Sequence, residues 1–191
     1  MTQHELLEQL KHQVEAQLSL AEESLISSSE ALLTQRPKAE KWNILECIQH
    51  LNQYAAYYIP LLEKSVLQAQ KRGNDTYSVG WLGGKFIKMM SPENTKPQKT
   101  LKHMNTLGKA VSIEVCHEFC TWQQRLLKVI SQLENKNINQ NKIPVEFLKL
   151  IKLKIGDALR FVVVHQQRHF LQIKSMLSKE KNASYYSFED K

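Results

Sequence analysis

Apolar residues recur along this chain every three or four positions, the spacing that places them on one face of an α-helix. The first such run covers residues 7–25. Its apolar positions are Leu7, Leu10, Val14, Leu18, Ala21 and Leu25. The SSSE sequence at 27–30 and the TQRP sequence at 34–37 interrupt the spacing. We therefore expect a helix over 7–25 that ends before these breaks.

Two further runs predict long helices in the middle of the chain. The second run extends from residue 44 to about residue 72, with Asn43 and Glu46 spaced as in a capping box. Its apolar stripe is Ile44, Ile48, Leu51, Ala55, Tyr58 and Leu62. Pro60 lies inside this run and predicts a kink or an early end there. The third stripe, which the polar residues 134–142 terminate, is Val111, Val115, Phe119, Trp122, Leu126, Val129 and Leu133.

The fourth run begins near Asp157, a good N-cap residue, and continues to about Lys179. Two of its inward positions are histidines, His165 and His169, where a helix facing a core normally carries aliphatic side chains. The other members of this stripe are Ala158, Val162, Ile173 and Met176. We expect a single domain over 1–180, followed by a polar C-terminal tail over 181–191.

Four amphipathic runs predict an all-α protein, a four-helix bundle with a long crossover between the second and third helices. No stretch shows the strict alternation needed for a sheet. The crossover has about thirty residues without a clear pattern, and a connection of this length is usually functional or contains a short helix. WLGGKFIKMM, at 81–90, is the candidate for that helix.

Composition and charge limit the compartment and the partners that the sequence predicts. No stretch approaches 18 consecutive apolar residues, and three cysteines without a secretory signal fit a reduced, cytoplasmic protein. The net charge of +7 is unevenly spread, with −5 over residues 1–35 and +5 over residues 85–109. The basic segment could attract an anionic ligand. We expect neither a membrane nor a nucleic-acid partner, because no nucleic-acid-binding motif accompanies the charge.

The spacing of His165 and His169 raises the question of whether they are core residues or share a ligand. Residues four apart lie one above the other on a helix, so both rings can reach one point. Of the remaining histidines, His50 lies beside the apolar stripe of the second run. Facing helices of a bundle can bring such side chains together around a metal ion. Core histidines bonded to their neighbours are the alternative.

Two motifs, WNILECIQHL at 42–51 and HQQRHFLQI at 165–173, resemble those of the DinB/YfiT-like superfamily. This resemblance implies a four-helix bundle that holds nickel or zinc through three histidines, which correspond here to His50, His165 and His169. It also implies a protein that is often a homodimer. Some relatives transfer low-molecular-weight thiols, and others are similar to hydrolases or isomerases.

Three imidazole ligands leave a coordination position open for a water or a thiolate. Glu46 and Gln172 are the expected partners of the ligands' second nitrogens, and Glu46 is the candidate to orient His50 or to shuttle protons. Gln166 stands where the HExxH proteases have their glutamate base, which argues against that class. We therefore expect a metal-dependent enzyme that acts on a small molecule, by hydrolysis or by thiol transfer. The alternative is a non-catalytic or stress-response protein with a structural metal, closed by a fourth ligand such as Glu46 or Cys47.

The remaining candidates are weaker. Cys116 and Cys120 share a helix face, where buried reduced thiols are the expectation. Cys47 lies three residues before His50, so it is expected near the pocket, and a catalytic Cys47–His50 pair remains open. Arg168 points away from the histidine stripe, toward an ion pair or the mouth of the pocket.

Overall fold

The structure, a computed structural model, describes residues 1–186 and the side chains of all of these except 141, 142 and 179–186. The α-helices are α1 (Gln3–Leu20), α2 (Glu30–Thr34), α3 (Ile44–Gln68), α4 (Trp81–Met90), α5 (Glu114–Leu133) and α6 (Ile155–Tyr186). A π-helical turn, Ala21–Leu25, extends α1, and a 3₁₀ turn, η2, spans Lys102–Met104. Two short strands, β1 (Asn141–Val145) and β2 (Leu148–Lys154), complete the described elements. The predicted mostly helical fold is confirmed.

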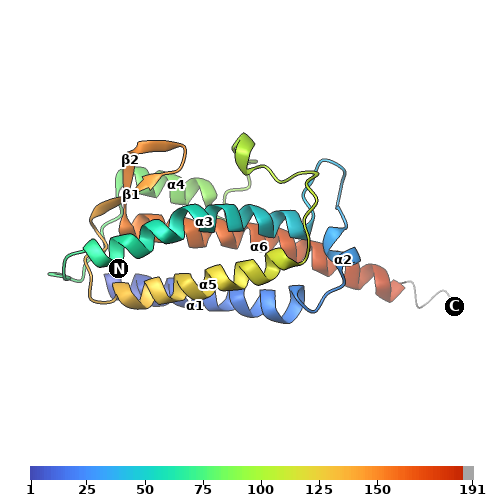
Figure 1. Ribbon diagram of the computed structural model, residues 1–191, viewed down its shortest axis with the longest axis horizontal. Coiled ribbons are helices and arrows are strands. Elements are labelled where there is room, and N and C mark those ends of the chain that lie inside the picture. The colour runs from blue at the N-terminus through green and yellow to red at the C-terminus, as the bar shows by residue number, and fades with distance from the viewer. Residues whose placement is uncertain (187–191) are drawn as a thin grey trace.

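The four long helices α1, α3, α5 and α6 form the bundle (Figure 1). α1 packs against α5 and α6, and α3 packs against the same two helices. α3 and α5 run in the same direction, opposite to α1 and α6 (Figure 1). Because parallel neighbours cannot be joined by a tight turn, the chain needs the long crossover that the sequence predicts.

The crossover carries its own helix, α4, over the predicted residues 81–90, and this helix packs on α6. The capping box of Asn43 and Glu46 is also confirmed at the start of α3. Of the two outcomes predicted for Pro60, a kink or an early end, the early end does not occur, because α3 continues through this proline to Gln68. The broken segment before α3 contains the short helix α2, which the sequence analysis did not predict.

Asp157 does not cap α6, which corrects the prediction. The helix already begins at Ile155, and Asp157 lies in its first turn with 1% of its surface exposed. Its carboxylate accepts hydrogen bonds from the Tyr77 hydroxyl and, at 3.0 Å, from the Gly80 amide. The residue therefore ties the segment before α4 to α6. Residues 187–191 of the predicted tail 181–191 lie outside the described residues.

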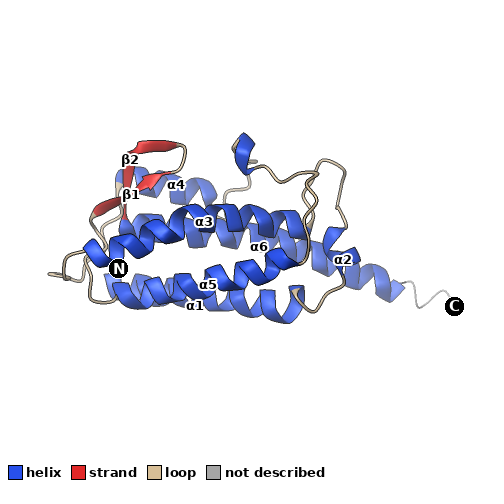
Figure 2. Ribbon diagram, viewed as in Figure 1, coloured by secondary structure: helices blue, strands red, loops and turns tan. Residues whose placement is uncertain are grey.

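The hairpin of β1 and β2 is the main departure from the predicted fold (Figure 2). Apolar side chains switch from one face of β2 to the other between Leu150 and Ile151, so the sequence lacks the period-two signal of a strand. The buried residues of the hairpin include Ile143, Val145 and Leu153, which join the bundle core. Within the described residues no helix is both long and apolar enough to cross a membrane.

Candidate metal centre

His50 is placed by the start of α3. The Asn43 side chain accepts from the Glu46 amide at 2.8 Å, and the Glu46 carboxylate accepts from the Asn43 amide at 3.0 Å. This reciprocal cap determines where the helix begins and therefore which residues face inward. His50 lies in the second turn that follows, with 2% of its surface exposed.

His165 and His169 come from the middle of α6. They are one turn apart and only 3% and 8% exposed, respectively. The Nε2 atom of His165 lies 3.3 Å from Nε2 of His50 and 3.1 Å from Nε2 of His169. The three ligand atoms are all within 4.8 Å of one another, so the structure brings the three predicted histidines together.

Hydrogen bonds to the other ring nitrogens set the protonation of this cluster. Nδ1 of His50 lies 2.9 Å from the Met104 carbonyl oxygen, and Nδ1 of His169 lies 3.0 Å from Oε1 of Gln172. Because these oxygens only accept, each Nδ1 must carry the proton and leave an unprotonated Nε2. The predicted contact of Gln172 is confirmed, whereas the partner of His50 is a backbone carbonyl.

The spacing of these nitrogens fits a divalent cation. Two nitrogens bound about 2.0–2.1 Å from a tetrahedral ion lie about 3.3 Å apart, by simple geometry. The separations of 3.3 and 3.1 Å match this value. The Nε2 atoms of His50 and His169 each carry a lone pair directed at Nε2 of His165. Without a cation, the one proton that His165 Nε2 can hold would satisfy only one of these lone pairs. The donor set and its spacing therefore suit a metal ion.

Burial keeps the imidazoles neutral, as metal ligands must be. Loss of hydration lowers the pKa of His50 to about 4, although the Met104 carbonyl opposes the shift. The same cause, with the neighbouring His50, lowers the pKa of His169 to about 3. Burial beside the other two rings holds the pKa of His165 well below its ordinary value.

Aromatic side chains form the walls of the site and explain this loss of hydration. The Trp42 ring lies 4.6 Å from that of His50, and the Tyr54 ring lies 4.5 Å from that of His165, centroid to centroid. Phe161 stacks on His165 at 6.0 Å. Trp42 is itself held by a hydrogen bond of 3.1 Å from its indole nitrogen to the Asn105 side chain.

Glu46 is fully buried, and its carboxylate has partners other than His50. It bonds Arg36 at 2.5 Å and the Gly108 amide at 2.6 Å, besides closing the capping box. Its backbone carbonyl accepts from the Thr106 hydroxyl at 2.9 Å. Glu46 therefore anchors the loop that follows Met104, the residue whose carbonyl bonds His50.

The three cysteines are buried and free. Cys47, Cys116 and Cys120 all belong to one hydrophobic cluster. Burial raises the pKa of the Cys47 thiol to about 12, so this thiol stays protonated at neutral pH. A buried thiol that stays protonated is a poor nucleophile, so these surroundings argue against a catalytic Cys47–His50 pair.

Arg168 and Gln166, which neighbour the histidines in the sequence, donate hydrogen bonds to other segments of the fold. Arg168 donates to three carbonyls of the crossover, those of Ser91, Asn94 and Lys96, at 2.6–3.2 Å. It therefore ties the basic segment to α6. Gln166 donates to Gln123 in the bundle core at 2.8 Å and does not serve as a base.

The hairpin contributes an acidic residue that the sequence analysis missed. Oε1 of Glu146 lies 2.8 Å from Nε2 of His103, and its Oε2 is buried without a partner among the described residues. Burial and the charge of Glu146 raise the pKa of Tyr54 to about 12. No motif marks Glu146, because the unpredicted hairpin is what brings its charge near Tyr54.

Comparison with known proteins agrees with this architecture. A family model described as the DinB superfamily matches residues 9–173, a range that includes His50, His165 and His169. Comparisons with curated proteins and with solved structures give no significant match. The family match covers far more than half of the sequence. The chain therefore belongs to the DinB superfamily.

Proposed function

We propose that this protein is a metal-dependent enzyme that acts on a small molecule, with nickel or zinc held by His50, His165 and His169. The observation that carries the proposal is the convergence of three neutral imidazole nitrogens within 4.8 Å of one another, with His165 at the spacing of a tetrahedral ion from each of the other two. Neither Glu46 nor Cys47 joins this group within the described part of the chain. Three protein ligands and no fourth favour a site with an open position, as in catalytic zinc sites.

A divalent ion held there would act as a Lewis acid that lowers the pKa of a bound water or thiol. The residues of the chain prepare the site for this chemistry. Met104 and Gln172 fix the orientation of two ligands through their Nδ1 atoms. The ring of Tyr54 lies beside those of His50 and His165. Its hydroxyl, whose pKa is raised to about 12, stays protonated and is available as a donor.

We further propose that the substrate is a small thiol or another small anionic molecule. The basic segment 85–109 borders the site, because it supplies the Met104 carbonyl that bonds His50. Its net charge of +5 favours negatively charged ligands near this point. Glu46 fits the role of a positioning residue, since it anchors this segment through the Gly108 amide.

A structural metal is the second candidate, and one observation favours it. The three histidines are only 2%, 3% and 8% exposed, so little of the site is open to solvent. A structural ion needs no access from solvent. An enzyme requires the substrate to reach the metal, and the most direct route passes His169, the most exposed of the three histidines. The two roles therefore differ in whether an external ligand can bind the ion.

Cobalt substitution separates these roles. We expect cobalt-loaded protein to develop a sulfur-to-cobalt charge-transfer band when a small thiol such as 2-mercaptoethanol is added. The Cys47→Ser variant should give the same band, because the sulfur comes from the added thiol. A cobalt spectrum that neither thiol nor azide changes would reject the enzyme and leave the structural role.

A further inference from the structure

Exposed apolar side chains concentrate on the segment around α4 and on the hairpin. Nine large apolar side chains of the described residues are strongly exposed, and five of them belong to these two segments. The five, with their exposed fractions, are Leu150 (100%), Trp81 (76%), Val79 (52%), Leu148 (46%) and Phe147 (44%). Single exposed apolar residues are ordinary, but a concentration of this kind marks an interaction surface.

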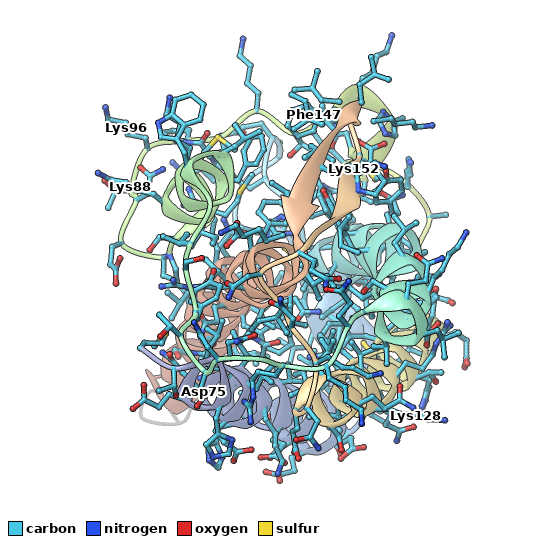
Figure 3. The ribbon with its side chains drawn as sticks, turned by 90° about the vertical axis from the view of Figure 1, so that its left-hand side faces the viewer. Asp75, Lys88, Lys96, Lys128, Phe147 and Lys152 are labelled. Carbon is cyan, nitrogen blue, oxygen red and sulfur yellow. The ribbon has the colours of Figure 1, made fainter. Side chains whose placement is uncertain are left out.

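The two segments are neighbours in space. α4 contacts β2, and the rings of Phe86 and Phe147 meet edge to face at 5.7 Å. Figure 3 shows Lys88 on α4, and Phe147 and Lys152 on the hairpin. All three lie on the side of the bundle opposite Lys128 (Figure 3). We call this surface the hairpin–α4 face. It consists of Val79, Trp81, Lys85, Lys88, Phe147, Leu148, Lys149, Leu150 and Lys152.

The charge of these segments is mainly positive. Glu146, at the turn of the hairpin, is the acidic residue among them, and it is mostly buried beside His103. Residues 77–91 and 147–156 contain five lysines and no aspartate or glutamate. On α4, Trp81, Lys85 and Lys88 follow helical spacing and are all exposed, and the Lys85 ammonium lies 3.8 Å from the centre of the Trp81 ring. The exposed apolar groups are therefore surrounded by positive charge.

We propose that the hairpin–α4 face binds the surface of a bilayer that contains anionic lipids. Burial of the aliphatic side chains of Leu148 and Leu150 in the acyl region is favourable. Trp81 has the amphipathic ring favoured at the headgroup level. The lysines are attracted to anionic headgroups. Such binding needs no spanning helix. It departs from the sequence-based expectation of no membrane partner, which rested on the lack of an apolar spanning stretch.

Two other occupants fit the face less well. A nucleic acid would use the lysines and the rings of Trp81 and Phe147, but it would leave the aliphatic side chains of Leu148 and Leu150 in water. A second copy of the chain related by a two-fold axis would bring together two surfaces of the same positive charge. A lipid surface is the partner that uses both the aliphatic groups and the positive charge.

Sedimentation with vesicles tests the proposal. The protein should pellet with vesicles of equal phosphatidylcholine and phosphatidylglycerol, not with phosphatidylcholine alone, and added salt should weaken binding. The double variant Lys149→Glu, Lys152→Glu and the single variant Leu150→Asp should each bind about tenfold or more weakly. Matched controls are Lys128→Glu and Leu67→Asp, which change exposed residues outside the face and should bind as the wild type does.

Four results would overturn the proposal. The first is no binding to anionic vesicles at low salt, and the second is equal loss of binding in the controls and the face variants. The third is a dimer in light scattering that Leu150→Asp converts to a monomer, without vesicle binding, which would assign the face to a second copy. Binding of single-stranded DNA that needs the lysines but not Leu150, again without vesicle binding, would assign it to nucleic acid.

Discussion

Acid should destabilise the metal-free protein, because three neutral histidines are buried together. In the unfolded chain a histidine has its ordinary pKa of about 6.5. In the folded protein the pKa falls to about 4 for His50 and about 3 for His169, and well below the ordinary value for His165. Below the unfolded pKa the unfolded chain binds more protons than the native protein. Linkage then requires the free energy of unfolding to fall as the pH falls.

The size of the effect follows from these shifts. At about pH 5 an unfolded histidine is almost fully protonated, whereas His50 with a pKa of about 4 is mostly neutral. The difference destabilises the native state by about 2 kcal/mol for each histidine relative to neutral pH. His169, with a pKa of about 3, should contribute a similar amount. Above the pKa of the unfolded histidines, no free energy of unfolding should be lost. The loss should grow as the pH falls below that pKa and should level off once the pH reaches the pKa values of the folded protein.

Urea unfolding of chelator-treated protein at several pH values between about 7.5 and 4.5 measures this dependence. The His169→Gln variant should lose about 2 kcal/mol less than the wild type between about pH 7.5 and 5, since it lacks one titrating ring. His12→Gln, which changes an exposed histidine on α1, is the matched control and should follow the wild type. Identical pH dependence in wild type and His169→Gln would refute the reasoning.

Three further predictions concern the residues that support the site and fold. Glu46→Gln should weaken zinc affinity about tenfold in a competition titration, because it loosens the loop that orients a ligand. Gly83→Ala should cost about 2 kcal/mol in urea unfolding, since its Cβ would collide with the Asp157 carboxylate, whereas Gly84→Ala should be neutral or stabilising. Leu126→Ala should cost about 3 kcal/mol in the same assay, because the side chain is fully buried in the core.

The helices and the pair of His165 and His169 were predictable because they depend on short-range spacing, whereas the resemblance to the DinB/YfiT-like superfamily added His50 to the ligand set. An apolar residue every three or four positions specifies a buried helix face wherever it occurs. His165 and His169 are visible as a pair because the same spacing stacks them, and the cap at Asn43 sets the phase that turns His50 inward. These features need no knowledge of the tertiary structure beyond the packing of the helices.

The parts that escaped prediction depend on contacts between distant segments. The partner of His50 is the backbone carbonyl of Met104, and a carbonyl is present in every residue, so no residue type reveals it. Asp157 resembles a helix cap locally, but Tyr77 and Gly80, about 80 positions away, determine its role. The charge of Glu146 comes near Tyr54 through a hairpin whose strand pairing is irregular, with a register shift between Pro144 and Val145.

X-ray absorption at the metal edge of zinc-loaded or nickel-loaded protein identifies the ligands of the bound ion. We predict one metal ion per chain, with three imidazole ligands and at least one further light atom at about 2.0–2.1 Å for zinc. The bound ion should be lost from each of the variants His50→Ala, His165→Ala and His169→Ala. The variant His117→Ala, which changes a residue of α5, should keep it. Protein that binds no metal, or a metal bound mainly by sulfur, would contradict the account.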